Sequence, residues 1–590
     1  MTISNDCAAE RKPLVAHLGW QVIAALGVVM VMGRELALRG SELARHLGES
    51  DDATRLVQVR EWLAGRSWFD LHTERFGLAD GMTSHWSRLL DAPIGGLIRL
   101  FSLFAEPDRA EILARAAWPL LLLIPLFAII VGTTERQGGR IAALLAMFYT
   151  ATCIPALEKF AIGRIDHHNA MIVCAMGSIL LAMRAYAVPR LAWWAGALAG
   201  LGLAIGYEGI VLAGVLFATV VLIGLADGRH AALAARVTGG AALTLALALV
   251  VTVPPGRLIA IHCDSLALNL VLAMGIGAAG VGVMAWCFSS ASWLVRALVL
   301  APFAMAAVAA YLLSEPACLA GPFGSVSAVT KDYWLDNVME TNSILQFGRN
   351  APAAAGAAAL FLGLALAVQV SIWRKAPVDP GNILMTATVA AAIGLACWQV
   401  KLMPYATLLA SVPLALFAAQ IGPQRLVSEV MARALFVLVG NLLVLQVLLV
   451  GFTPVSAASG PSREDCSTGA VLKPLAALAP GRVLAPMDIG AFIVAHTPHN
   501  VLSAPYHRLD AAIVEQAALW TATDMAEAER RMRADGIRYV VNCAGLNEPL
   551  ALAQTNPPGL RVLLDAGRVP DFLVPVALPL ASPLTVYRLR

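Results

Sequence analysis

The chain has 590 residues, of which 59% are hydrophobic and only 14% are charged. A soluble domain carries about a quarter charged residues, so much of this chain is expected to lie in lipid rather than in water. The formal net charge is +3, which is too small to indicate a nucleic-acid-binding surface. We therefore expect membrane lipids, and no nucleic acid, as partners.

Long apolar stretches follow one another through residues 1–452. A helix that crosses a bilayer needs roughly 20 apolar residues. The first stretch ends at Gly33-Arg34-Glu35 without a small-residue cleavage site, which indicates a retained span rather than a signal peptide. A shorter stretch, 92–105, is interrupted by Arg99 and is predicted to lie at the membrane surface. The pattern predicts about thirteen spans, near 14–33, 116–133, 141–156, 169–187, 191–206, 209–226, 237–254, 267–288, 293–313, 353–373, 383–400, 404–420 and 434–452.

Basic residues mark alternate loops, and such loops face the cytoplasm. The apolar run 191–226 must be split at Tyr207-Glu208-Gly209 for the alternation to hold. The N-terminus is then cytoplasmic, and four segments face outward: 34–115, 157–168, 314–352 and the tail from about 453. We expect a bacterial inner membrane with the tail in the periplasm. The basic loops contain Arg11/Lys12, Arg136/Arg140, Arg190, Arg229/Arg236, Arg374/Lys375 and Arg425/Arg433.

The tail, residues 453–590, has the pattern of a small soluble domain. Its apolar stretches are short, as in 482–485 and 537–541, and a segment rich in Ala, Glu, Arg and Met lies between them at 524–535. This alternation of strand, helix and strand predicts a compact α/β unit. The predicted fold is thus a polytopic α-helical membrane domain, 1–452, followed by a small α/β domain.

Four of the nine cysteines are outward on this topology, and Cys7 is cytoplasmic. No cysteine spacing resembles a zinc site. In an oxidising compartment the outward cysteines would form two disulfides, Cys263–Cys318 between loops and Cys466–Cys543 within the tail. The alternative is four free thiols.

Acidic and histidine side chains gather in the outward loops. Charges at membrane depth are costly, so their clustering on one side indicates a functional site; the alternative is a set of solvated charges at the headgroup boundary. The first loop holds Ser50-Asp51-Asp52, Trp68-Phe69-Asp70-Leu71-His72 and His85-Trp86-Ser87-Arg88; the second holds Arg164-Ile165-Asp166-His167-His168-Asn169; and the third holds Lys331-Asp332-Tyr333-Trp334 and Val338-Met339-Glu340.

A metal site can be assembled from these groups. Asp166 and His168 are alternate residues, so an extended backbone would point both toward one ion. Asp51 or Asp52, together with His85, would complete a mixed oxygen and nitrogen site. Such a site suits Mn²⁺ or Zn²⁺, and Mg²⁺ if the imidazoles do not bind. A divalent ion would neutralise a phosphate leaving group, while a carboxylate activates or orients the acceptor.

Two further polar residues have two interpretations each. Glu208, between two apolar runs, is either a buried polar partner or a loop residue. Lys401, at the outer end of a span, either reaches the headgroups or contacts the phosphate of a polyprenyl carrier.

Together these features resemble the catalytic subunits of bacterial and archaeal oligosaccharyltransferases, membrane glycosyltransferases of the GT-C class. The resemblance extends over most of the chain, including the number of spans and the outward C-terminal domain. The run Gly81-Met-Thr-Ser-His-Trp86-Ser-Arg-Leu-Leu-Asp91 resembles the family's Gly…His-Trp…Leu-Asp segment, which follows its catalytic Asp. Either Asp51 or Asp52 is the counterpart of that catalytic residue.

Further roles follow from the resemblance. The run from Asp166 to His168 is similar to the family's metal-binding motif and supplies two ligands. Glu340 matches a family glutamate that contacts the acceptor. Lys401 matches a family arginine near the lipid phosphate, although lysine lacks the bidentate geometry of arginine. We predict that Lys401 and Arg164 bind the donor phosphate.

The tail departs most from the family. The family reads the acceptor with a Trp-Trp-Asp-Tyr-Gly motif, and the matching Pro486-Met487-Asp488-Ile489-Gly490 keeps only the Asp and the Gly. This implies an acceptor other than an Asn-x-Ser/Thr sequon: a lipid, a glycan or another protein group. Asp488, His507 and Arg508 are the predicted acceptor contacts. For His507 and Arg508, a structural hydrogen-bonded turn is the alternative.

The sequence thus predicts a glycosyltransferase that takes a sugar or oligosaccharide from a polyprenyl-phosphate or -pyrophosphate donor. A transporter or flippase of a lipid-linked glycan is the alternative, but transporters place polar groups near the bilayer midplane. A membrane scaffold would leave the cluster of acids and histidines unexplained.

Overall fold

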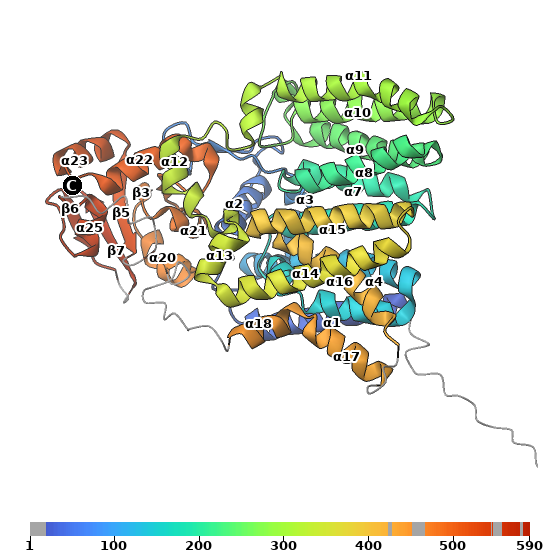
Figure 1. Cartoon of the computed structure of the whole chain (residues 1–590). Coiled ribbons are helices and arrows are strands. Elements are labelled where there is room, and N and C mark those ends of the chain that lie inside the picture. The colour runs from blue at the N-terminus through green and yellow to red at the C-terminus, as the bar shows by residue number, and fades with distance from the viewer. Residues whose placement is uncertain (1–18, 423–427, 451–465, 544–545, 547–556, 579–581) are drawn as a thin grey trace, which may run out of the picture.

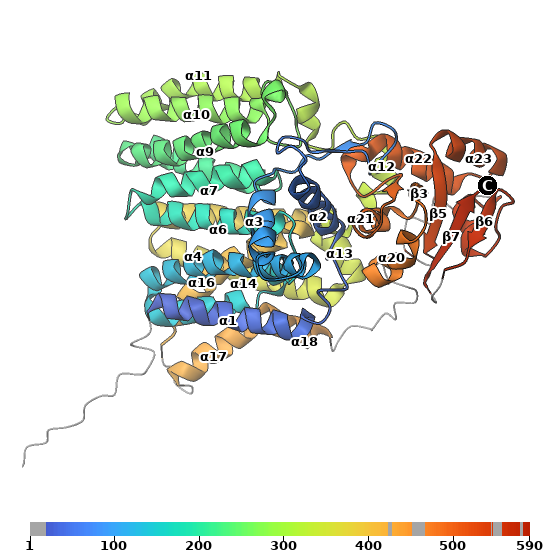
Figure 2. The ribbon, with the colours of Figure 1, turned by 180° about the vertical axis from the view of Figure 1, so that it is seen from behind.

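The computed structural model describes residues 19–422, 428–450, 466–543, 546, 557–578 and 582–590. Cys7, Arg11, Lys12, Arg425 and the predicted domain boundary at 452/453 lie outside these residues. In the described part, long helices lie side by side, and a small sheet lies beyond one end of them (Figure 1). Seen from behind, α2 lies between this bundle and the C-terminal elements (Figure 2).

Helices occupy the ranges that the hydropathy pattern predicts. By length and apolar composition, nine of the described helices could cross a membrane, or ten if the bent pair α17–α18 is one span. The predicted number of thirteen spans therefore stays a prediction. In chain order the bundle helices are α1 (Trp20–Arg39), α4 (Pro107–Ala151), α6 (His168–Ala185), α7 (Leu191–Ile205), α8 (Ile210–Ala226), α9 (Ala231–Thr252), α10 (Leu268–Cys287), α11 (Trp293–Leu312), α14 (Pro352–Lys375), α15 (Pro380–Trp398), α16 (Met403–Ala419), α17 (Glu429–Val439) and α18 (Leu442–Val450).

Two breaks in the helices match predicted boundaries. The 45-residue α4 contains two predicted spans, and Gly139 interrupts its helical backbone with a φ of 76°, a conformation that favours glycine. The apolar run 191–226 is divided between α7 and α8, which brings Glu208 to the turn between them. Glycines also allow α7 to approach α9 closely, since a Cβ on Gly196 would lie 2.0 Å from the carbonyl oxygen of Val237.

Short elements fill the connections at the site end of the bundle. They include α3, which the sequence places at the membrane surface. These elements are α2 (Ser50–Leu63), β1 (His72–Thr73), β2 (Met82–Thr83), α3 (Asp91–Phe101), α5 (Ile154–Leu157), η2 (Glu158–Phe160), η4 (Pro255–Arg257), η5 (Pro316–Ala320), α12 (Ala328–Tyr333), η6 (Leu335–Asn337), η7 (Met339–Thr341), α13 (Ile344–Asn350) and η8 (Val400–Leu402); η3 (Gly228–His230) lies between α8 and α9.

The C-terminal part is the predicted α/β unit. Its sheet has the strand order β4-β3-β5-β7-β6, parallel between β4, β3 and β5 and antiparallel at β7 and β6. The predicted strands at 482–485 and 537–541 and the helix between them are confirmed. The elements are α20 (Gly469–Ala476), β3 (Arg482–Leu484), α21 (Met487–His496), β4 (Asn500–Val501), η9 (His507–Leu509), α22 (Asp510–Thr521), α23 (Met525–Ala534), β5 (Ile537–Cys543), α25 (Leu560–Asp565), β6 (Leu573–Val576) and β7 (Leu584–Leu589).

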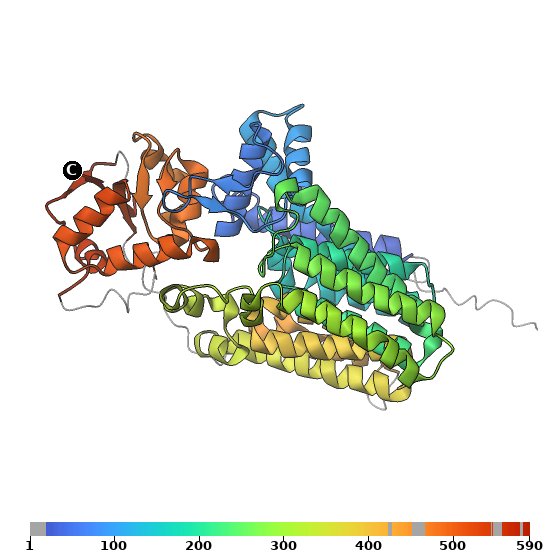
Figure 3. The same ribbon diagram turned by 90° about the horizontal axis from the view of Figure 1, so that it is seen from above.

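The first outward loop and the C-terminal part share one hydrophobic core. Buried side chains of α2 and α3 pack in one cluster with those of α21, α22 and the sheet. Polar contacts reinforce this packing: Tyr506 donates to the carbonyl oxygen of Ser50 at 2.8 Å, and its hydroxyl lies 2.7 Å from Thr54 Oγ1. From above, the first loop and the C-terminal part again lie side by side (Figure 3). The C-terminal part is thus anchored on the loop that carries Asp51 and Asp52.

Candidate active site

Asp52 organises the start of α2 and the loop before α6. It is the third residue of α2 and forms a capping box with Glu49, whose backbone N–H donates to Asp52 Oδ2 at 2.8 Å. Asp52 Oδ1 accepts from the backbone N–H groups of Ile165, at 2.6 Å, and Asp166, at 2.9 Å. This buried carboxylate therefore joins two segments that are far apart in the sequence.

Arg164 completes this junction. Its guanidinium pairs with Asp52, with Glu49 at 2.5 Å and with Asp166. Asp166 in turn accepts from the backbone N–H of His168 at 3.0 Å. Burial opposes ionisation of Asp166, but Arg164 outweighs it and holds the pKa of Asp166 well below its usual range. Arg164 is thus committed to three carboxylates.

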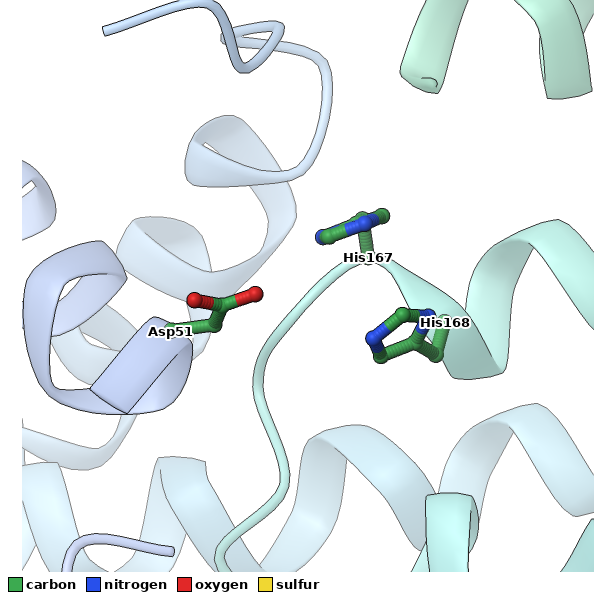
Figure 4. A group of neighbouring side chains, drawn as sticks. All are labelled: Asp51, His167 and His168. Atoms are coloured by element: carbon green, nitrogen blue, oxygen red, sulfur yellow. The ribbon is translucent and has the colours of Figure 1, made fainter. Parts of the chain in front are cut away.

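The adjacent residue, Asp51, faces a different way. Its carboxylate points toward the imidazoles of His167 and His168 (Figure 4), and one potential ligand atom from each of the three lies within 4.8 Å of the others. His167 caps α6 and His168 is its first residue, so the beginning of this helix brings both rings to the N-terminal turn of α2.

Glu208 orients the two histidines from the turn between α7 and α8. Its carboxylate lies 3.0 Å from His168 Nδ1 and 3.7 Å from His167 Nε2. A carboxylate on one ring nitrogen leaves the other nitrogen available as a ligand. His167 Nδ1 is buried without a hydrogen-bond partner among the described residues. We name Asp51, His167, His168 and Glu208 the α2–α6 cluster.

The α2–α6 cluster fits a divalent cation. Its donors are two imidazoles and a carboxylate, which suit Zn²⁺ or Mn²⁺, and the unpartnered His167 Nδ1 is one of them. Negative charge is also in excess around it. Burial chiefly raises the pKa of Asp51 to about 8; His168 opposes this shift, while Asp166 and Glu49 add to it. A bound cation would favour the ionised carboxylate.

A cavity of about 890 Å³ opens beside this cluster. His167 and Glu208 line it on one side, and apolar side chains of α7 and α8 line another part. Its other polar and aromatic lining includes Asp70, His72, His85, Trp86, Tyr207, Asp264, Tyr311, Phe323, Trp398, Lys401, His507 and Arg508.

A second group of polar side chains faces the same cavity. Asp264, in the loop between α9 and α10, lies 2.7 Å from His507 Nε2 and forms a bidentate pair with Arg508. The ring of His85 lies 4.6 Å from that of His507. We name His85, Asp264, His507 and Arg508 the Asp264 cluster.

The third outward loop also reaches the site. Glu340 pairs with Lys159 at 2.7 Å, and Lys159 lies 4.0 Å from Glu49. Lys401 lies in η8 and lines the cavity, where a donor phosphate would be accessible to it. The three predicted loops therefore do converge at one end of the bundle.

The predicted metal ligands are not the set that the structure brings together. The carboxylates of Asp52 and Asp166 accept hydrogen bonds from backbone N–H groups and pair with Arg164. His85 belongs to the Asp264 cluster, and Asp51 joins His167 and His168 instead. The reason is local: His168 begins a helix, so the extended backbone assumed for 166–168 does not form.

Two other predicted residues differ in placement. Arg164, predicted to bind the donor phosphate, is nine-tenths buried against acidic side chains. Asp488, predicted to contact the acceptor, lies in the first turn of α21, where its carbonyl oxygen accepts from Ser50 Oγ at 3.4 Å; it is not among the described residues that line the cavity. His507 and Arg508 do line it.

Sequence reasoning missed Asp264 and Lys159 and left Glu208 undecided. The only signal for Glu208 was a single acid between two apolar runs. Both predicted disulfides are present, Cys263–Cys318 and Cys466–Cys543, and Cys263 stands next to Asp264. The position of Asp264 beside Cys263, which was predicted to form a disulfide, was the sequence feature that could have indicated it.

The bundle, the convergent loops and the C-terminal sheet define a multi-pass membrane protein with the GT-C fold. Among solved structures, the oligosaccharyltransferase of the archaeon Archaeoglobus fulgidus in its apo form is similar, with a TM-score of 0.63, 14% identity and coverage of 90% of this chain and 70% of that chain. The AglB structure from this organism with an inhibitory peptide and a dolichol-phosphate gives a TM-score of 0.62, 13% identity and coverage of 89% and 69%.

A third structure of that enzyme, in complex with Zn and sulfate, gives a TM-score of 0.52, 17% identity and coverage of 89% and 68%. No protein-family model matches the chain. No curated protein matches it either.

Proposed function

We propose that this protein is a glycosyltransferase that moves a sugar or oligosaccharide from a polyprenyl-(pyro)phosphate donor to an acceptor. One observation carries the proposal: loops from several parts of the chain converge on one cavity at the end of a GT-C bundle. Polar side chains line the cavity at the bundle end, and apolar side chains of α7 and α8 line another part. A lipid-linked sugar needs both surfaces. The similar archaeal enzyme has been solved with dolichol-phosphate.

The reaction would proceed by attack of an acceptor hydroxyl, or a comparable nucleophile, on the anomeric carbon of the donor. The bond from that carbon to the phosphate oxygen breaks, and the (pyro)phosphate leaves with the electron pair. Asp51, next to the cavity-lining His167, would orient the acceptor and take its proton. Lys401 is placed to stabilise negative charge on the leaving group.

A divalent ion held by Asp51, His167 and His168 would supply additional stabilisation of the leaving phosphate. Glu208 would hold the imidazoles in the ligating orientation. Arg164 and Asp52 position the two segments that carry these ligands. Glu340, held by Lys159, would contact the acceptor from the third loop. His507 and Arg508 form the wall facing the C-terminal part.

We infer that the site faces the periplasm of a bacterial inner membrane. Both disulfides lie on segments at the site end, as expected in an oxidising compartment. The loops at the other end carry most of the short-loop Lys and Arg residues. The degenerate stretch at Asp488 supports an acceptor other than a sequon, such as a lipid or a glycan.

The test is a glycan and glycolipid profile of a deletion strain complemented with the wild type, with Asp51→Asn or with Asp80→Asn. Asp80 is an exposed acid of the same loop and serves as the matched control. We expect the deletion and Asp51→Asn strains to lack one glycosylated product and to accumulate its polyprenyl-linked precursor. Restoration of the product by Asp51→Asn at normal expression would refute the assignment of Asp51.

A further inference from the structure

Arg508 joins three segments of the chain through one guanidinium. Its Nε and Nη2 atoms donate to the two carboxylate oxygens of Asp264 at 2.7 and 2.8 Å. Nη2 also donates to Ser265 Oγ at 3.1 Å, and Nη1 donates to the carbonyl oxygen of Thr83 in β2 at 3.1 Å. His507 adds a further contact to Asp264 at 2.7 Å. The C-terminal part is thereby tied to the first loop and to the α9–α10 loop.

A metal ion is the competing explanation of this cluster, because His85, Asp264 and His507 each offer one ligand atom within 4.8 Å of the others. Arg508, however, places a permanent positive charge on the same carboxylate and engages both of its oxygens. A bidentate pair of this kind balances the charge without an ion. The α2–α6 cluster differs: in the part of the chain that the structure describes, no arginine or lysine pairs with its carboxylates, Asp51 and Glu208.

The loop that carries Asp264 is itself restrained. The adjacent Cys263 forms a disulfide with Cys318 of the third outward loop. That loop is held in turn by Asp510, which accepts from the Ser327 hydroxyl at 2.8 Å and directly follows η9. Asp264 therefore sits where the disulfide-linked loops meet the C-terminal part and, through Arg508, the first loop, at the wall of the cavity.

We propose that Asp264 is a positioning residue: by binding Arg508 and His507, it fixes η9 of the C-terminal part and the α9–α10 loop at the wall of the cavity in which transfer takes place. The inference rests on the proposed function for its effect on catalysis. A fixed wall would hold the acceptor relative to the donor, and a misplacement of about 1 Å between reacting groups can cost up to about a hundredfold in rate.

The experiment uses the full chain in lipid nanodiscs with Asp264→Asn, which removes the charge, and Asp264→Glu, which keeps it. Asp227→Asn is the control, since Asp227 also pairs with an arginine, Arg229, but at the opposite end of α9. Hydrogen–deuterium exchange is measured in 254–267 and 503–510. Sugar transfer is measured as kcat and KM for the donor.

We expect Asp264→Asn to raise exchange in both segments and to lower kcat by about tenfold to a hundredfold, with little change in the donor KM. Asp264→Glu should recover most of the protection from exchange and most of kcat, and Asp227→Asn should behave as the wild type. Unchanged exchange in Asp264→Asn, or raised exchange with an unchanged kcat, would overturn the proposal. So would the loss of one equivalent of bound metal from Asp264→Asn, because the cluster would then be a metal site. If the wild type itself transfers no sugar, the proposed function fails. The exchange data still decide whether Asp264 restrains the segments 254–267 and 503–510.

Discussion

The α2–α6 cluster and the Asp264 cluster face the same cavity but are held in different ways. Around the first, Asp52 is fixed by backbone N–H groups from two segments, and Arg164 pairs with three acids. Around the second, one carboxylate on a loop binds two residues of the C-terminal part. The first arrangement fixes two segments at the catalytic residues, whereas the second ties only η9 to a loop of the bundle. The rest of the C-terminal part is anchored on the first loop by the shared hydrophobic core and by Tyr506.

The burial of the two arginine side chains, Arg164 and Arg508, differs in the same direction. The side chain of Arg164 is 9% exposed and that of Arg508 is 22% exposed. Charged hydrogen bonds out of water are costly to leave unpaired, whereas those at a wet rim are replaced by water. We therefore expect the loss of Arg164 to destabilise the folded chain more than the loss of Arg508 does.

The largest effect that can test this contrast is on stability. Arg164→Gln leaves three acids without their counter-charge, so we expect unfolding to become easier by about 3–5 kcal/mol. Arg508→Gln leaves one acid, Asp264, without its counter-charge, so the loss should be smaller, about 1–3 kcal/mol. Thermal unfolding of both variants in the same detergent measures the difference. Equal losses would show that the two clusters are held alike.

A smaller effect separates the two neighbouring acids of α2. Asp52→Ala removes a helix cap and the acceptor of two loop N–H groups, so we expect a loss of about 2 kcal/mol. Asp51→Ala should not lower stability, because burial disfavours the ionised form of Asp51 in the folded chain, yet it should abolish sugar transfer. Unfolding temperature and transfer are measured on the same preparations. If Asp51→Ala unfolded as readily as Asp52→Ala, Asp51 would be a structural residue.

Much of the fold follows from the sequence, because hydropathy periodicity and charged loops are local signals. The split at Tyr207-Glu208-Gly209, the strands at 482–485 and 537–541 and the pairing of outward cysteines were all predictable in this way. The convergence of the three acidic loops also followed, since all were placed on one membrane face.

The identity of the site residues was less predictable, because it depends on contacts between distant segments. Whether Asp51 or Asp52 faces the histidines is decided by the capping box of α2, and whether His167 or Asp166 joins them is decided by where α6 begins. Asp264 meets Arg508 only after the C-terminal part has packed on the first loop. No local pattern distinguishes that aspartate from other loop acids.

The pH dependence of stability provides a third, smaller test of the excess negative charge at the α2–α6 cluster. Burial raises the pKa of Asp51 to about 8 from 3.8, so in this range the folded chain binds a proton that the unfolded chain releases. In chelator-treated protein, stability should therefore fall as pH rises from about 4 to 8, by at most about 1.4 kcal/mol per pH unit.

Asp51→Asn has no carboxyl group to titrate at this position, so its curve should be flatter. Mn²⁺ or Zn²⁺ should also flatten the curve of the wild type, because the cation favours the ionised carboxylate. Unfolding temperatures across this range, with and without the cation, measure both effects. A slope that survives in Asp51→Asn would assign the titration to another group.

The smallest expected effect concerns the link between the third loop and the catalytic loops. Glu340 is 45% exposed and its partner Lys159 is 12% exposed, so the pair is worth no more than about 1 kcal/mol. Lys159→Glu and Glu340→Lys should each lower transfer by about fivefold, which is the same energy expressed as a rate, because the loop is then repelled from the site.

The double variant restores the pair with its charges exchanged and should regain most of the lost activity, as a double-mutant cycle would show. Asp332→Lys, an exposed acid in the same loop, controls for added positive charge and should leave transfer unchanged. Rescue would show that the Lys159–Glu340 pair holds the third loop against the catalytic loops. Additive losses would mean that Glu340 acts independently of Lys159. The pair would then not hold the third loop against the catalytic loops.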